Sequence, residues 1–208
     1  MLIAIISDSH DNIYNIEKFL NWCEKNSIEM IIHCGDLAAP AVLKKEFSLK
    51  FKGPFHFVHG NVADRELNEE FAQELENVTC HGDKGELEIS SPPFEGGVRG
   101  GSGGEKKEVT FKTPPNLPLE SGGVIKIAFC HFPEVAKELA LSGEYNLVFY
   151  GHTHKPWMET LENGCQLINP GTLAGMFNKA TFAVYDSLTK NLELVLVEKI
   201  NTDVAVGG

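Results

Sequence analysis

The first half of the chain alternates short apolar runs with amphipathic stretches. Residues 2–6 are almost entirely apolar and too few for an isolated helix, which is typical of a strand buried on both faces. The stretch that follows carries apolar residues at helical spacing, with Asn12 as its N-cap. Three such strand–helix units in succession predict a parallel sheet with right-handed crossovers. The expected strands are residues 2–6, 30–34 and 55–59, and the expected helices are 12–26, 40–47 and 66–75.

The second half of the chain begins in the same way and then changes. A strand over 124–130, a helix opening at Pro133 and a strand over 147–150 continue the first pattern. Strands without helices follow, and Asn163-Gly164 is the turn signal of a hairpin. These expected strands are residues 158–161, 165–168, 181–186 and 192–198. An α/β half followed by a more antiparallel half predicts two packed sheets with helices outside.

The stretch over residues 82–123 does not follow either pattern. It is so rich in glycine and proline that we expect a flexible surface insertion between two strands rather than a functional lid. No other stretch resembles a domain boundary. The prediction is therefore one domain over residues 1–208 that carries this insertion.

Composition and charge narrow the class of protein. The chain has 208 residues and a hydrophobic fraction of 42%, which is ordinary for a soluble globular protein. Its net charge of -11 opposes binding to nucleic-acid backbones. Five cysteines without a Cys-x-x-Cys pair predict buried free thiols and a reducing compartment. With neither a secretory signal nor a membrane-length apolar run, we expect a cytoplasmic protein that does not contact membranes.

Metal-capable side chains follow five of the expected strands. Open α/β sheets bind ligands at the carboxyl ends of their strands, so these side chains should converge. A single loop histidine is usually solvated or hydrogen-bonded without a metal, but five coincidences make that explanation unattractive. The candidate ligands are Asp8, His10, Asp36, Asn61, His131, His152 and His154.

The size of this set favours two metal ions over one. Seven oxygen and nitrogen ligands exceed the four of a tetrahedral zinc site, and the set has no thiolate. Two cations roughly 3.5–4 Å apart can hold a hydroxide and neutralise a phosphoryl group during in-line displacement. Manganese is the first candidate, and zinc, iron, nickel and cobalt stay open. Because the ligands must be deprotonated, metal should be lost below about pH 6.5.

The same residues, in order, carry a family resemblance. Asp8-Ser-His10, Gly35-Asp36, Gly60-Asn61, His131 and Gly151-His-Thr-His154 together resemble the motifs of the calcineurin-like metallophosphoesterases. The short chain and the Asn169-Pro-Gly-Thr172 loop are most similar to the small YfcE-type phosphodiesterase branch. The resemblance implies an α/β fold, a four-layer αββα sandwich of two mixed β-sheets flanked by helices.

The resemblance also implies roles for the seven residues. One ion would be held by Asp8, His10, Asp36 and His154, and the other by Asp36, Asn61, His131 and His152. Asp36 would bridge the two ions, and Asn61 would help them hold the phosphoryl oxygens. The implied activity is metal-dependent hydrolysis of a small phosphate ester, most of all a diester, by attack of a metal-bridging hydroxide.

Two positions depart from the family pattern. Many relatives have Gly-Asn-His-Asp, in which the histidine protonates the leaving group, but here Val62 follows Asn61 and Asp64 comes one residue late. General-acid help is worth about 10²–10⁴ in rate, so its loss favours esters with good leaving groups. Phe132-Pro133 follows His131, where relatives often have His-Gly-His, so the surroundings of that ligand must differ.

Other interpretations of the chain stay open. One is a protein-interaction scaffold of the Vps29 type that retains metal with little or no catalysis. Another is a hydrolase with a single metal ion. His33 is expected to be a hydrogen-bonded core residue, and His56, His59 and His81 show no ligand spacing. The sequence also leaves room for a homo-oligomer.

Overall fold

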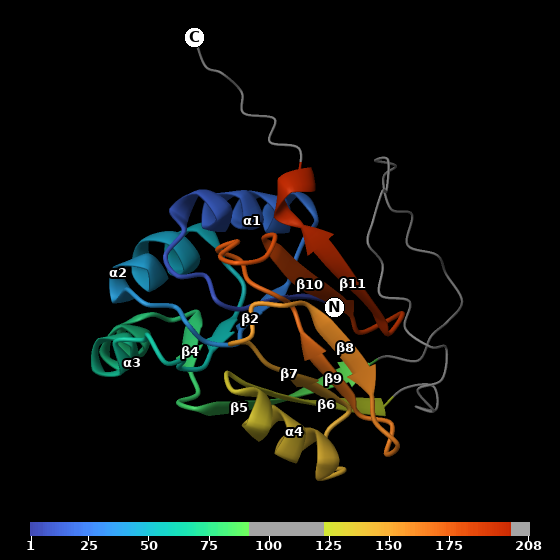
Figure 1. The fold of residues 1–208 in the computed structure, drawn as a ribbon. Helices are drawn as coiled ribbons and strands as arrows, with labels where there is room; N and C mark the ends of the chain where they lie inside the picture. Colours follow the sequence, from blue (N-terminus) through green and yellow to red (C-terminus); the bar gives the residue numbers. More distant parts are fainter. Residues whose placement is uncertain (92–122, 201–208) are drawn as a thin grey trace.

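The computed structural model describes residues 1–91 and 123–200, which form two β-sheets (Figure 1). The larger sheet has the strand order β11-β10-β1-β2-β3-β4, and the smaller has the order β5-β6-β7-β9-β8. The strands are β1 (Leu2–Ile6), β2 (Met30–His33), β3 (Phe55–Phe57), β4 (Val78–Cys80), β5 (Lys84–Ser91), β6 (Gly123–Cys130), β7 (Leu147–Phe149), β8 (Trp157–Thr160), β9 (Gln166–Asn169), β10 (Thr181–Asp186) and β11 (Asn191–Leu196).

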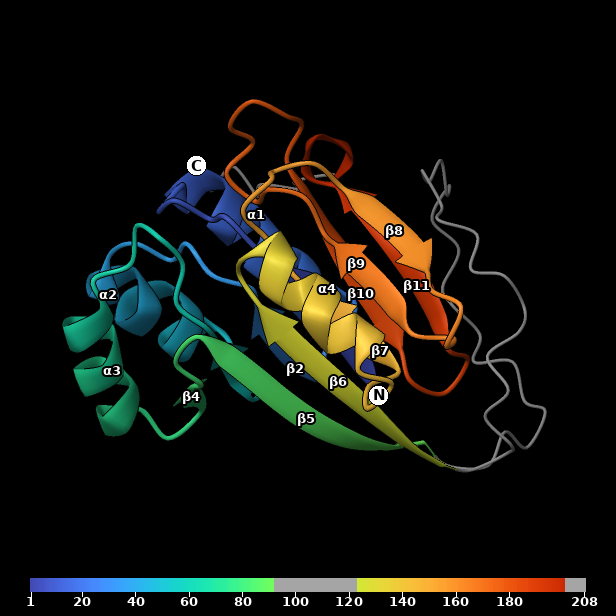
Figure 2. The same ribbon diagram turned by 60° about the horizontal axis from the view of Figure 1, so that its bottom comes forward.

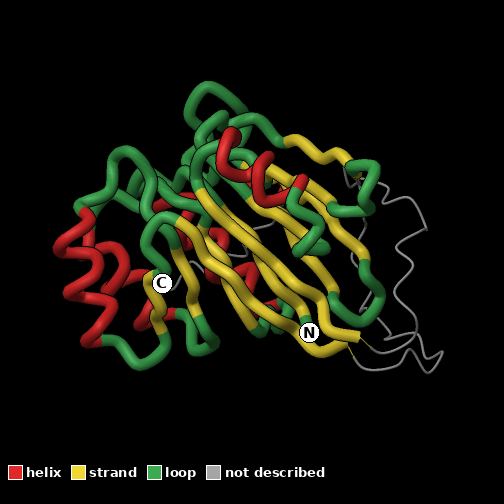
Figure 3. The backbone as a smooth tube through the Cα atoms, turned by 90° about the horizontal axis from the view of Figure 1, so that it is seen from below, coloured by secondary structure: helices red, strands yellow, loops and turns green. Residues whose placement is uncertain are grey.

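Helices cover the outer face of each sheet. The first three helices and the π-helical turn η1 lie against the larger sheet, whereas α4 lies on the smaller one (Figure 2). Seen from below, the strands run side by side between the helices (Figure 3). The helical segments are α1 (Ile13–Lys25), α2 (Pro40–Val42), η1 (Leu43–Ser48), α3 (Arg65–Glu74), α4 (Pro133–Leu141) and the short 3-10 turn η2 (Val197–Lys199). This is the predicted four-layer αββα sandwich.

The apolar run of β1 shows why these layers form. Ile3 and Ile5 pack between the two sheets, whereas Ala4 and Ile6 pack beneath the helices. All four are fully buried, because successive side chains of a strand point to opposite faces and both faces of this strand are covered. One short stretch of sequence therefore contributes to two separate hydrophobic layers.

Strand direction places five loops together. Strands β1, β2, β3 and β4 run parallel to one another in the larger sheet, and β6 and β7 are parallel in the smaller one. The carboxyl ends of the two sheets adjoin, since the His152 amide donates to the Asp8 carboxylate and the His131 ring contacts the carbonyl of Cys34. The sequence predicted one shared edge, and the structure forms it from two sheets.

The sequence interpretation was wrong about the start of the insertion. Residues 84–91, which it placed in the insertion, form β5 and pair antiparallel with β6 over its whole length. The sequence signal for this strand is the alternation of Leu87 and Ile89 with Glu86 and Glu88. Ile89 packs into the core between the sheets, and Leu87 packs against that core. Strand β4 was also not predicted. Residues 92–122 lie outside the described part of the chain, so their expected flexibility stays a prediction.

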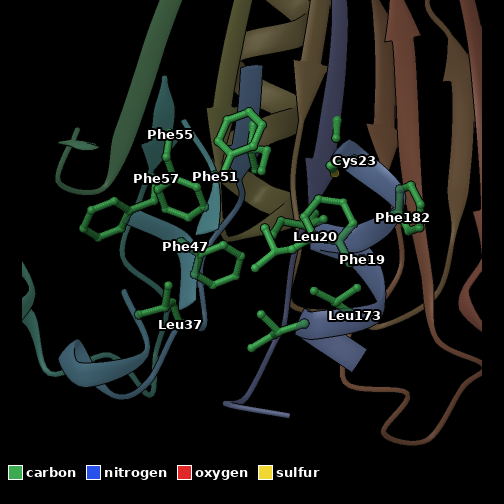
Figure 4. Packing of buried hydrophobic residues seen from close by; sticks show 14 of the residues in the cluster. Phe19, Leu20, Cys23, Leu37, Phe47, Phe51, Phe55, Phe57, Leu173 and Phe182 are labelled. Carbon is green, nitrogen blue, oxygen red and sulfur yellow. The ribbon is translucent and has the colours of Figure 1, made fainter. Parts of the chain in front are cut away.

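Phe182 on β10 packs between the larger sheet and the helices that cover it (Figure 4). Its ring is fully buried, with ring centroids 4.9 Å from Phe19 and 5.0 Å from Trp22. We expect Phe182→Ala to lower the free energy of unfolding by about 3–5 kcal/mol in urea denaturation, since it leaves a cavity. The control Leu141→Ala, at a side chain that is 60% exposed, should stay within about 0.5 kcal/mol. A loss below about 1 kcal/mol for Phe182→Ala would contradict the packing described here.

Candidate metal centre

The seven predicted ligands all lie in loops at the adjoining carboxyl ends of the two sheets. The larger sheet supplies Asp8 and His10 after β1, Asp36 after β2 and Asn61 after β3. The smaller sheet supplies His131 after β6 and the pair His152 and His154 after β7. The site therefore lies across the junction of the two sheets and belongs to neither alone.

The backbone is strained at most of these positions. Positive φ angles put a non-glycine residue in the left-handed region, which costs roughly 1–2 kcal/mol per residue. Such strain persists where the surrounding structure enforces it, and it is concentrated at functional sites. The ligands with positive φ are Asp8 (51°), His10 (39°), Asp36 (60°), His152 (67°) and His154 (59°).

Glycine at position 35 is required by the contact between the sheets. Its φ is +97°, and a Cβ at this position would lie 2.6 Å from Nδ1 of His131. Any larger residue would therefore push His131 away from Asp36. The glycine that precedes Asp36 in sequence thus sets the position of a ligand from the other sheet.

One group of donors surrounds Asp8. Its Oδ1 is buried without a hydrogen-bond partner among the described residues, although Nε2 of His154 lies 3.1 Å away and Nε2 of His10 lies 3.9 Å away. The two Nε2 atoms of these histidines are 3.3 Å apart. An unpaired buried carboxylate oxygen facing two imidazole nitrogens suits a divalent cation.

A second group of donors surrounds Asn61. Its Oδ1 lies 3.1 Å from Nε2 of His131 and 3.0 Å from Nδ1 of His152. The other ring nitrogen of His131, Nδ1, lies 2.9 Å from the carbonyl of Cys34 and donates its proton there. The Nε2 atom of His131 is thereby left to face the site.

Asp36 lies between the two groups. Its Oδ2 is 3.7 Å from Nε2 of His10 and 3.5 Å from Nε2 of His131, and its Oδ1 accepts a hydrogen bond from the Val62 amide. The structure thus brings all seven predicted residues together. Their donor set is mixed oxygen and nitrogen, which fits the ligand preferences of divalent transition metals.

Burial and charge shift the pKa values of three of these groups. Burial raises the pKa of Asp8. Burial also acts to raise the pKa of Asp36, but the hydrogen bond and charge of His131 outweigh it and lower the pKa to about 2. Burial acts to lower the pKa of His131, yet the partner Asp36 raises it above the usual 6.5. Without a cation, the Asp36–His131 pair therefore favours the doubly charged form.

The loop Asn169-Pro-Gly-Thr172 supports these ligands from behind. The Asn169 side-chain amide donates to the carbonyl of Gly151, and the Thr172 hydroxyl donates to the carbonyl of Asp8 at 2.9 Å. His33 is fully buried and lies 2.9 Å from the Ser9 hydroxyl, which confirms it as a hydrogen-bonded core residue. The family resemblance singled out this loop, but no sequence pattern predicted that Asn169 and Thr172 bond to the backbone at Gly151 and Asp8.

Two aromatic rings border the site. Phe132 lies 5.1 Å from the rings of both His131 and His152, measured between ring centroids. Phe177 is 90% exposed, has a φ of 63° and lies 5.7 Å from the His154 ring. Nothing in the sequence pattern singled out Phe177, because the exposure of one loop residue leaves no periodic signal.

The fold and the converging ligands define a metallophosphoesterase type of site. The family model for the calcineurin-like phosphoesterase superfamily domain matches residues 1–190, and the chain belongs to this superfamily.

Individual relatives agree with this family. The chain is 25% identical over 199 residues to phosphodiesterase MJ0936 of Methanocaldococcus jannaschii, and the match covers 95% of this chain and 100% of the relative. A solved archaeal phosphodiesterase is 24% identical with a TM-score of 0.69, and the match covers 94% of this chain and 99% of that one.

Two further solved structures share the fold at lower identity. The phosphoesterase YfcE of E. coli is 15% identical with a TM-score of 0.56, over 97% of this chain and all of that one. A single mutant of Vps29 from Entamoeba histolytica is 15% identical with a TM-score of 0.57, over 93% of this chain and 90% of that one.

Among the described residues, none of the helices has the length and apolar character needed to cross a membrane.

The raised pKa of His131 sets the pH dependence of metal binding. A proton on Nε2 competes with a cation, and the pKa of this ring lies above 6.5, so apparent affinity for Mn²⁺ should begin to fall while the pH is still above that value. Isothermal titration calorimetry at pH values from about 8.5 to 5.5 measures this affinity across the expected titration range. An affinity that stays constant over the whole range would contradict the placement of His131 in the site.

Proposed function

We propose that this protein is a phosphodiesterase that hydrolyses small phosphate esters with two divalent cations held at the sheet junction. The observation that carries the proposal is the position of Asp36, whose Oδ2 lies between Nε2 of His10 and Nε2 of His131. A carboxylate placed between two donor groups can hold two cations close together, as in the two-metal sites of phosphatases. Membership of the calcineurin-like phosphoesterase superfamily supports the hydrolytic chemistry.

The two donor groups correspond to two cation positions. Asp8, His10 and His154 would hold one cation, and Asn61, His131 and His152 would hold the other. Asp36 would bind both. When bound, the cations would neutralise the phosphoryl oxygens and supply the nucleophile for in-line displacement. Manganese is our first candidate, because the seven donors include carboxylates and no thiolate, and zinc, iron, nickel and cobalt are the alternatives that the imidazole donors also suit.

The chain's own residues determine what happens to the leaving group. Val62 lies where many relatives have the histidine that acts as general acid. Val62 is 43% exposed, and its side chain has no proton to donate. Asp64, one position late for that role, instead caps α3 by accepting from the Leu67 amide at 3.4 Å. The leaving group must therefore depart without a side-chain general acid at this position, which favours aryl or similarly acidic alcohols.

The two aromatic rings at the border of the site suit the same substrates. Phe177 presents an almost fully exposed face beside His154, and Phe132 lies against His152. A planar leaving group could stack on either ring, and aromatic pairs of this kind contribute about 0.5–1.5 kcal/mol beyond their area burial. The site thus combines a polar centre for phosphate with an apolar border.

Organisation and location follow as further parts of the proposal. The hydrophobic core has three layers, of which the first two both contain residues of β1 and the last two both contain residues of β6. This continuity supports a single domain. All five cysteines are free thiols, which supports a reducing, cytoplasmic environment. The net charge of -11 supports a small ester as substrate in preference to a polynucleotide.

A scaffold of the Vps29 type is the second candidate. Its support is the shared fold together with the missing general acid. It predicts a stable protein partner and no turnover, whereas the phosphodiesterase proposal predicts turnover by the isolated protein. Retention of all seven ligands in one converging site favours the enzyme.

Substitution of Asp36 tests the proposed chemistry. With Mn²⁺, Ni²⁺, Co²⁺ or Zn²⁺, the wild type should hydrolyse bis-p-nitrophenyl phosphate, and Asp36→Asn should lower kcat/KM by at least about 100-fold, since even outer partners of metal ligands cost 10–100-fold. The matched control Asp64→Asn keeps the cap on α3 and should retain activity within about twofold. Absence of hydrolysis of both this diester and p-nitrophenyl phosphate by the wild type, with every metal, would refute the proposal.

Metal stoichiometry separates the dinuclear proposal from a single-metal hydrolase. We expect elemental analysis of the manganese-loaded wild type to find about two equivalents per chain, because the site offers two donor groups. Asp36→Asn should retain fewer, since both groups lose a shared ligand. One equivalent of manganese in an active wild type would exclude two-ion catalysis and would favour a hydrolase with a single metal ion.

A further inference from the structure

Three metal-ligating side chains converge at a second place that shares no residue with the seven. His59 lies in the loop after β3, Glu69 lies on α3 and Cys80 is the last residue of β4. Helix α3 is the crossover between these two neighbouring parallel strands. The loops are also joined directly, because the His59 amide donates to the carbonyl of Gly82 at 2.7 Å.

The donor atoms meet at Nε2 of His59. This nitrogen lies 2.9 Å from Oε1 of Glu69 and 3.5 Å from Sγ of Cys80, and the three donor atoms all lie within 4.8 Å of one another. Tetrahedral zinc bonds of about 2.0–2.3 Å put neighbouring ligand atoms about 3.3–3.6 Å apart. The nitrogen–sulfur distance already has this value, and the nitrogen–oxygen pair needs to open by only a few tenths of an ångström.

The cluster is buried on the His59 side and open to solvent on the Glu69 side. His59 is buried, and its Nδ1 has no hydrogen-bond partner among the described residues, so Nε2 makes the polar contacts of the ring. Cys80 is half-buried and the Glu69 side chain is 54% exposed, which leaves one side of the cluster open to solvent. Three protein donors and an open position match the four-coordinate preference of zinc.

The hydrogen bond between His59 and Glu69 does not by itself explain the cluster. One ring nitrogen has a single proton or a single lone pair, so it cannot make a full interaction with the carboxylate and with the sulfur at once. A cation at their centre would satisfy the nitrogen, the oxygen and the sulfur together. The nearby Arg65 does not take this place, because its guanidinium is paired with Asp83 at 2.7 Å.

We propose that His59, Glu69 and Cys80 form a zinc site that joins α3 to the edge strand β4. A thiolate with an imidazole and a carboxylate favours zinc over magnesium or manganese, in contrast to the thiolate-free set at the sheet junction. The site would fix the loop that carries Asn61, which is two residues after His59. The inference does not rest on the proposed hydrolysis, because the two sites share no residue.

Cobalt is a spectroscopic substitute for zinc that separates this site from the other. The full-length, metal-free protein is titrated with Co²⁺, and the near-ultraviolet thiolate-to-cobalt charge-transfer band is followed. Only Cys80 among the proposed ligands of either site has a thiolate, so wild type should show the band and Cys80→Ser should lose it. Cys165→Ser, at a buried cysteine elsewhere in the fold, is the matched control and should keep the band.

Glu69→Gln tests the third ligand. We expect it to weaken Co²⁺ binding, measured by the same band, by at least about tenfold, as loss of even an outer partner does. A wild type without the band, or a band that survives in Cys80→Ser, would overturn the proposal. Unchanged affinity in Glu69→Gln would also overturn it, because two ligands do not make this site. Circular dichroism checks that each variant is folded.

Discussion

The burial of Asp8 and Asp36 at the junction of the two sheets is the constraint on which the rest of the structure depends. A carboxylate is strongly destabilising in a protein interior unless opposite charge or hydrogen-bond donors surround it. Here the donors are the amides of Val62 and His152 and three histidine rings. His10 comes from the larger sheet, and His131 and His154 come from the smaller one. The sheets must therefore pack with their carboxyl ends in register, and the core between them maintains this alignment.

The chain accepts local strain to meet that constraint. Five of the seven predicted ligands have left-handed backbone angles, and Gly35 has no room for a side chain against His131. In ordinary loops asparagine or glycine would occupy many of these positions at lower cost. Keeping aspartate and histidine there exchanges stability for a fixed donor geometry, which is the usual relation between stability and activity at functional sites.

The sequence predicted the fold and a converging set of candidate ligands, because apolar periodicity marks the strands and the candidate ligands come directly after them. The run at residues 2–6 could only be a doubly buried strand, and Asp8 and His10 come directly after it. Packing relations across the fold left no such trace. The pairing of β5 with β6 was missed because glycine and proline nearby dominated the pattern, and the contacts of His59 with Glu69 and Cys80 arise only when a crossover brings three distant segments together.

Because the proposed centre is divided between two sheets, cation binding there would be coupled to the packing of one sheet against the other. A cation held by His131 from one sheet and Asn61 from the other, whose donor atoms lie 3.1 Å apart, would be lost if the sheets separated. At 100 times its Kd such a ligand adds about 2.7 kcal/mol to the bound state. Chelation would thus loosen the seam between the halves before it affected either half, and proteases would find their first cleavage sites along that seam.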